Sequence, residues 1–219
     1  MFNTGMLVSL LAAAMVSASS LTIHNQCDGP VTVQIAVLGG TRPDVTIAAE
    51  GNASGGEGIP QDRNGIALNF ITDPAQTNVA MSRAEVNFTP DNPAGNTFIN
   101  LSNMFGFSVP VELTGTGCKN YVCNIASGCP ASGPGGSCVS PCCNALDGCQ
   151  GASSCPNGQR PGDQGGGPGP HSDFYKGACP NSYAWGEEDS DEPDRDLGSF
   201  CSGDDIEITL CTDKPSSNL

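Results

Sequence analysis

The chain has 219 residues, and its 8 basic and 23 acidic side chains give a formal net charge of −15. A chain this acidic repels nucleic acids and anionic membranes, which argues against a partner of either kind. Aromatic residues make up only 5% of the sequence, whereas glycine contributes 29 residues. The protein therefore cannot fill a large core with rings and must depend on small side chains, loops and covalent links.

The N-terminus predicts a signal peptide. Leu7 to Ser17 is a nearly continuous apolar run, and small residues follow it, so that cleavage is expected after Ala18 or Ser20. The run is too short to span about 30 Å of hydrocarbon. We therefore expect residues 1–20 to be a signal peptide and the mature protein to be secreted, to the extracellular space or the cell wall.

After the leader, the chain is organised as short β-favouring runs that end at glycine, proline or asparagine turn signals. The expected strands are Val31–Leu38, Asp44–Ala49, Gly65–Thr72, Ala84–Thr89, Thr97–Asn103 and Phe107–Leu113, with Asp205–Leu210 as the closing strand. Strands spaced in this way, without a helical period between them, predict an all-β protein built as an antiparallel β-sandwich or barrel.

Two segments in the second half are expected to be surface loops. Pro156–Pro170 is a low-complexity stretch of glycine, proline and polar residues. Glu187–Asp196 holds seven acidic residues and one arginine, and such a run is usually a solvated loop.

Twelve cysteines occur in the chain, none before Cys27, and eight of them are crowded between Cys118 and Cys155. An even number behind a leader predicts six disulfides in a protein kept in an oxidising compartment. The segment from Gly117 to Cys155 has almost no large apolar side chains, so bridges replace a core there. No zinc site is credible in that compartment, and we expect neither a metal nor a cofactor.

Three Asn-x-Ser/Thr sequons predict N-glycosylation if the host is a eukaryote. They begin at Asn52, Asn87 and Asn100.

Five motifs occur in an order that is familiar from one protein family. They are LTIHNQC (Leu21–Cys27), NLSNMFGFSVPVEL (Asn100–Leu113), GCKNYVC (Gly117–Cys123), GGSCVSPC (Gly135–Cys142) and HSDFYKGACPNSYAW (His171–Trp185). With these motifs the chain resembles the thaumatin-like proteins of the pathogenesis-related group 5 type. The resemblance implies an antiparallel β-sandwich of residues 21–117 and 198–219, with a disulfide-rich loop lobe of residues 118–197.

The resemblance also implies how the cysteines pair. The implied bridges are Cys27–Cys211, Cys118–Cys201, Cys123–Cys179 and Cys129–Cys138. The last two bridges would use Cys142, Cys143, Cys149 and Cys155. Family order favours Cys142–Cys149 with Cys143–Cys155, and the crossed alternative stays open, because adjacent cysteines do not normally bridge each other.

Family members carry an acidic cleft between sandwich and lobe, where some bind or slowly hydrolyse β-1,3-glucan. Hydrolysis needs two carboxylates, one protonated to help the leaving group and one ionised to activate water or attack. Glu85 matches the family's cleft glutamate, and Glu188 is the candidate for the second carboxylate. Two cleft aspartates of the family are replaced, by Asn100 and Phe105, and the family's arginine, which falls near Thr72, is absent.

Sugar contacts are expected from polar and aromatic side chains around this cleft, since aromatic rings stack on pyranose faces. The candidates are Asn100, Phe105, Tyr183, Trp185 and Asp189.

The sequence therefore predicts a secreted, monomeric thaumatin-like protein that binds β-1,3-glucan or a related wall polysaccharide, in defence or wall remodelling. Weak endo-β-1,3-glucanase activity is an open question, because only part of the family's cleft is retained. The alternative is a non-catalytic defence, effector or inhibitor protein that binds a basic protein partner through its acidic loop.

Overall fold

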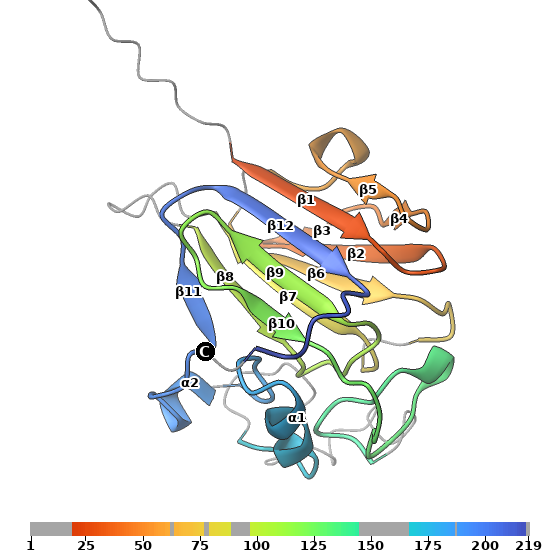
Figure 1. The fold of residues 1–219 in the computed structure, drawn as a ribbon, viewed down its shortest axis with the longest axis vertical. Helices are drawn as coiled ribbons and strands as arrows, with labels where there is room; N and C mark the ends of the chain where they lie inside the picture. The colour runs from red at the N-terminus through yellow and green to blue at the C-terminus, as the bar shows by residue number, and fades with distance from the viewer. Residues whose placement is uncertain are drawn as a thin grey trace, which may run out of the picture.

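The computed structural model describes residues 19–61, 64–76, 79–88, 97–144, 167–186 and 188–217. Within these residues, two β-sheets pack face to face, and the helices α1 and α2 lie at one end of them (Figure 1). The β-sandwich expected from the sequence is confirmed.

One sheet has five strands in the order β10-β9-β12-β1-β5. Its strands are β1 (Ser20–Asn25), β5 (Asn52–Ala53), β9 (Val111–Gly115), β10 (Tyr121–Cys123) and β12 (Asp205–Leu210). β1 runs parallel to β12, and the other neighbours are antiparallel. β10 extends this sheet past residue 117, which was the expected end of the first part of the sandwich.

The other sheet has seven strands, in the order β11-β8-β7-β6-β2-β3, with β4 also paired to β2. Its strands are β2 (Val31–Val37), β3 (Gly40–Thr41), β4 (Val45–Ile47), β6 (Ile66–Ile71), β7 (Ser82–Asn87), β8 (Phe98–Ser102) and β11 (Gly198–Phe200). All of its neighbouring pairs are antiparallel. This sheet carries the candidate site on its outer face.

The core lies between the two sheets, because each strand turns every second side chain inward. Leu21, Ile23, Leu68, Ile99 and Ile208 are buried there, each with at most 1% of its surface exposed. Burying one such side chain contributes about 1.5–3 kcal/mol. Aliphatic side chains thus supply most of this core, in keeping with the low aromatic content of the chain.

The helical segments are short. They are η1 (Gly55–Glu57), η2 (Pro134–Gly136), α1 (Ser172–Ala178) and α2 (Glu188–Asp191). α1 was not expected from the sequence. α2 lies in the acidic run that was predicted to be a solvated loop, and the prediction is wrong for Glu188, which is fully buried. An ion pair with the buried Lys176 holds this carboxylate inside the protein.

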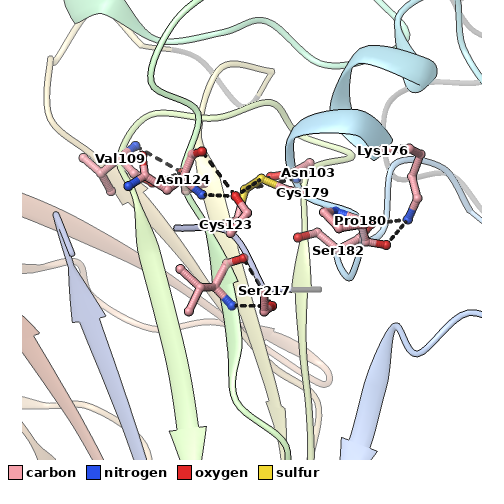
Figure 2. Close-up of a disulfide and its surroundings, with 12 residues drawn as sticks. Asn103, Val109, Cys123, Asn124, Lys176, Cys179, Pro180, Ser182 and Ser217 are labelled. Carbon is pink, nitrogen blue, oxygen red and sulfur yellow. Dashed lines mark hydrogen bonds between the residues drawn. A yellow bond between two sulfur atoms is a disulfide. The ribbon is translucent and has the colours of Figure 1, made fainter. Parts of the chain in front are cut away.

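Four disulfides with the pairing implied by the resemblance are present: Cys27–Cys211, Cys118–Cys201, Cys123–Cys179 and Cys129–Cys138. Figure 2 shows the bridge that ties β10 to the end of α1.

The remaining cysteines are only partly described. Cys142 and Cys143 are also disulfide-bonded. Their expected partners, Cys149 and Cys155, lie outside the described residues, as do the leader up to Ala18 and most of Pro156–Pro170. None of the described helices is long and apolar enough to cross a membrane.

Candidate functional site

Strand β7 divides its side chains between the core and the outer face of the seven-stranded sheet. Ser82, Ala84 and Val86 are buried, whereas Arg83 and Glu85 are only partly buried and point the other way. This division follows from the two-residue period of a strand. Arg83 and Glu85 therefore stand next to each other on one face.

A hollow of about 290 Å³ opens beside Glu85. Glu85 pairs across the sheet with Ala67 of β6 on one side and with Asn100 of β8 on the other. The small side chain of Ala67 leaves space over β6. The lining residues are Gly65, Ile66, Ala67, Glu85, Val86, Asn87, Phe98 and Asn100.

Arg83 holds the centre of this face through three contacts. Its Nε donates to Asn69 Oδ1 at 2.7 Å, and its Nη1 lies 3.3 Å from Glu85 Oε1. Its guanidinium carbon lies 3.6 Å from the centroid of the Phe105 ring. Burial lowers the pKa of Arg83, while the neighbouring carboxylate of Glu85 acts in the opposite direction. Arg83 remains a cation, since arginine does not lose its proton in proteins.

No arginine stands at Thr72, and Arg83 is the arginine that contacts Glu85. The residue that sequence reasoning missed is Arg83, and the signal for it was the Arg-x-Glu spacing within one strand, which places both side chains on the same face. Because Arg83 covers one face of the Phe105 ring, the expectation that Phe105 stacks on a sugar is wrong for that face.

Asn100 is only 5% exposed, and within the described residues its Oδ1 has no hydrogen-bond partner. An unpaired buried acceptor costs about 1–3 kcal/mol, and a ligand donor can satisfy it. Glycosylation of Asn100 stays a prediction. Asn52 is exposed and Asn87 partly exposed, and glycosylation of these two stays a prediction.

Tyr183 lies at the edge of β8, where its N–H donates to the Leu101 carbonyl at 3.0 Å and its carbonyl accepts from the N–H of Asn103 at 2.7 Å. Burial, followed by the charges of Asp189 and Glu85, raises the pKa of Tyr183 to about 12. The negative charges of both Asp189 and Glu85 therefore act on the Tyr183 hydroxyl.

Glu188 and Glu85 do not form a pair of solvent-accessible carboxylates. Its side chain has no exposed surface and forms an ion pair with Lys176. The N–H of Ala184 donates to Glu188 Oε2 at 2.7 Å. Burial raises the pKa of Glu188, although the contact with Lys176 lowers it. The prediction of Glu188 as a catalytic carboxylate is wrong, because no substrate can reach a carboxylate enclosed in this way.

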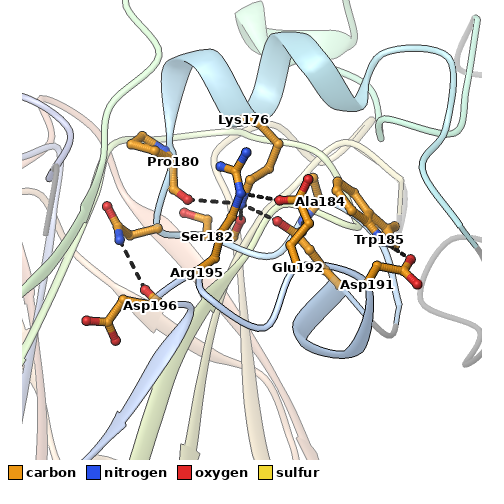
Figure 3. Close-up of polar contacts among 11 residues, drawn as sticks. Lys176, Pro180, Ser182, Ala184, Trp185, Asp191, Glu192, Arg195 and Asp196 are labelled. Atoms are coloured by element: carbon orange, nitrogen blue, oxygen red, sulfur yellow. Dashed lines mark hydrogen bonds and ion pairs between the residues drawn. The ribbon is translucent and has the colours of Figure 1, made fainter.

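The side chain of Trp185 is likewise buried and engaged in a contact within the protein. It is 6% exposed, and its Nε1 donates to Asp191 Oδ2 at 2.9 Å, which fastens α2 (Figure 3). A buried indole offers no face to a sugar, so the prediction of Trp185 as a stacking residue is wrong. Glu187 lies outside the described residues.

The described residues contain no group of three or more histidine, cysteine, aspartate or glutamate side chains that could hold a metal ion. The lining of the hollow supplies one carboxylate, two amides and the ring of Phe98.

Two solved structures resemble this chain weakly. The protein elicitor MoHrip2 from Magnaporthe oryzae is 18% identical, with a TM-score of 0.46 over 89% of this chain and 100% of that one. The thaumatin-like xylanase inhibitor TLXI is 15% identical, with a TM-score of 0.45 over 88% of this chain and 99% of that one. At such values neither one informs on what this chain binds.

The family assignment rests on a broader match. The model of the Thaumatin family matches residues 72–212, which is more than half of the chain and includes β7, β8 and the cysteine-rich segment. The chain is a member of the thaumatin family.

Proposed function

We propose that this protein binds β-1,3-glucan in the hollow beside Glu85 and does not hydrolyse it. One observation carries the proposal: among the described residues that line the hollow, Glu85 alone bears a carboxylate, and the expected second carboxylate, Glu188, is enclosed with Lys176. Glycoside hydrolysis needs two carboxyl groups on either side of the bond that breaks.

The polar groups of the hollow suit a neutral sugar better than an ion. Arg83 lies against Glu85 and offsets its charge, so neither a cation nor an anion gains a strong net attraction. The amides of Asn87 and Asn100 line the same hollow. Carboxylates and amides together accept and donate hydrogen bonds, as the hydroxyl groups of a sugar require.

The proposal includes secretion. The four described disulfides persist only where thiols stay oxidised, as in the extracellular space. An extracellular protein with a sugar-binding hollow can reach the polysaccharides of a cell wall.

The test compares Glu85→Gln with Glu207→Gln, a change at an exposed position of β12 in the other sheet. We expect the wild type and the control to bind insoluble β-1,3-glucan and to release no reducing ends from soluble laminarin. Glu85→Gln should weaken binding about tenfold, since a hydrogen bond to a charged group contributes about 1.5–3 kcal/mol. Reducing ends released by the wild type and lost in Glu85→Gln would contradict the non-hydrolytic assignment.

A second candidate function is the binding of a basic protein through the acidic segment. The observation that favours it is that Asp189, Asp191 and Asp194 are exposed, while the buried Glu188 fixes the segment that carries them. Exposed charges are screened over about 8–10 Å at physiological salt. Binding through this segment should therefore weaken as salt rises, whereas binding to a neutral glucan should not.

A further inference from the structure

Two phenylalanine rings stand beside the hollow. Phe98 lines it, and the ring of Phe200 lies 5.1 Å from the ring of Phe98 at an angle of 58°. Phe200 is 57% exposed, although it is a large apolar side chain. Among the described residues, Leu38 is the other large apolar side chain that is exposed.

The sheet register places this pair in line with the polar groups. Phe200 of β11 pairs with Phe98 of β8, and Phe98 pairs with Asn87 of β7. These three side chains form one row across the outer face. The next row on the same face, two residues along each strand, contains Glu85, Asn100 and Gly198. The two rings are therefore direct neighbours of the row that holds the carboxylate and the unpaired amide oxygen.

Gly198 makes room for the Phe98 ring. A Cβ atom at position 198 would lie 2.4 Å from the Cζ atom of Phe98. No real Cβ makes so short a contact, so any larger residue at 198 would move the ring. The aromatic pair and the glycine therefore form one arrangement, which we name the Phe98–Phe200 shelf.

We propose that the Phe98–Phe200 shelf binds the apolar face of a pyranose ring of a neutral saccharide, while hydroxyl groups of that ring reach Glu85 and Asn100. This inference rests on the proposed function and names the residues that hold the sugar ring there. Two independent observations support it: the exposed ring of Phe200 and the buried, unpaired Oδ1 of Asn100.

A saccharide matches this combination of groups. One face of a pyranose presents C–H groups, which pack on the negative face of an aromatic ring, and its rim presents hydroxyl groups. Binding pockets for small molecules typically combine such apolar walls with a few placed polar groups. The side chain of Leu38 lies near Gly65, on the other side of the hollow, where a Cβ at Gly65 would come within 3.4 Å of Leu38 Cβ.

The experiment measures the affinity of the full chain for laminarihexaose by calorimetry. Phe200→Ala removes the outer ring of the shelf, and we expect affinity to fall about tenfold, because both the flat aromatic face and the apolar contact are lost. Phe200→Trp should bind within about threefold of the wild type because it keeps a flat ring. Phe200→Leu, the matched control for an apolar side chain without a ring, should bind nearly as weakly as Phe200→Ala.

Two further variants separate the shelf from general apolar contact. Gly198→Ala displaces Phe98 while both rings remain in the sequence, and it should also weaken binding several-fold. Leu38→Ala removes an even more exposed apolar side chain that has no ring, and it should change affinity less than Phe200→Ala. Phe200→Ala and Gly198→Ala binding within twofold of the wild type would overturn the shelf while leaving the proposed glucan binding intact.

If the wild type does not bind laminarihexaose, the proposed function fails, and the same variants are tested on hexasaccharides of xylan, chitin and mannan. Binding of one of these that depends on Phe200 would support the shelf with a different sugar. Binding of none of them would overturn the shelf as well.

Discussion

The buried carboxylate of Glu188 forms an ion pair with the buried ammonium group of Lys176. Lys176 Nζ also donates to the carbonyl oxygens of Pro180 and Ser182, each at 2.9 Å (Figure 3). One lysine thus joins α1 to α2 and to the turn that precedes Tyr183. The start of the acidic segment is therefore held in a defined position relative to α1.

Removing the lysine should strongly destabilise the protein. Lys176→Met leaves the Glu188 carboxylate buried without a counter-charge, and breaking a buried pair in this way costs about 3–5 kcal/mol. The free energy of unfolding is measured by urea denaturation. The matched control is Lys119→Met, which removes the half-exposed partner of Asp196 and should cost at most about 1 kcal/mol. Equal losses for the two variants would contradict the structural role of the pair.

Arg83 should not tolerate replacement by lysine. Lysine cannot donate to Asn69 and Glu85 in the fixed geometry of a guanidinium while also stacking on Phe105. We expect Arg83→Lys to lower the free energy of unfolding by about 2 kcal/mol and to weaken glucan binding, because Glu85 loses its neighbour. Arg195→Lys is the control, since Arg195 forms a partly exposed pair with Glu192. If Arg83→Lys lowers the free energy of unfolding no more than Arg195→Lys does, the contacts of the Arg83 guanidinium do not contribute to stability.

Several strands could be predicted because apolar and polar residues alternate along them, and the alternating burial of β2, β7 and β12 follows that pattern, whereas β6 and β8 each bury three or four residues in a row. β12 begins and ends where the pattern predicts, and each of the seven strands expected from the pattern overlaps an observed one. β3, β5, β10 and β11 have only two or three residues each, which is too short for an alternating pattern. β11, which carries Phe200, pairs with β8 far away in the sequence, and only the folded chain brings them together.

The site was harder to predict than the fold, because burial of polar groups depends on distant partners. Nothing in the run Glu187–Asp196 distinguishes Glu188 from its acidic neighbours, and its partner Lys176 belongs to another helix. Arg83 and Glu85, in contrast, are separated by one residue of a predicted strand, so their contact was within reach of the sequence. The exposed Phe200 had no sequence signal, since an isolated phenylalanine usually predicts a core position.

The three tyrosines predict how stability falls at alkaline pH. Burial raises the pKa of Tyr121, Tyr175 and Tyr183, the last to about 12 from an ordinary value of 10. Because the folded pKa is above the unfolded one, each hydroxyl stabilises the fold fully below about pH 10, and this contribution is lost as the pH rises through the folded value. The phenolate ultraviolet absorbance of the folded protein should thus appear at higher pH than that of the urea-denatured chain.

Tyr183→Phe should remove the phenolate step near pH 12 and reduce the alkaline loss of stability. Coincident titrations of the folded and denatured chains would contradict the raised pKa values of these tyrosines.

The bridges should differ in how much they stabilise the fold, according to the length of chain that each one closes. Cys27–Cys211 spans a sequence separation of 184, whereas Cys129–Cys138 spans 9. The chain-entropy model assigns about 5 kcal/mol to the long closure and about 3 kcal/mol to the short one. Replacing both cysteines of a bridge by serine should therefore lower the urea midpoint more for Cys27 and Cys211, which fasten the start of the chain to its last strand. A larger loss for the Cys129–Cys138 variant would contradict this ranking. It would mean that native contacts around that short bridge stabilise the protein more than the loop-closure entropy of the long bridge does.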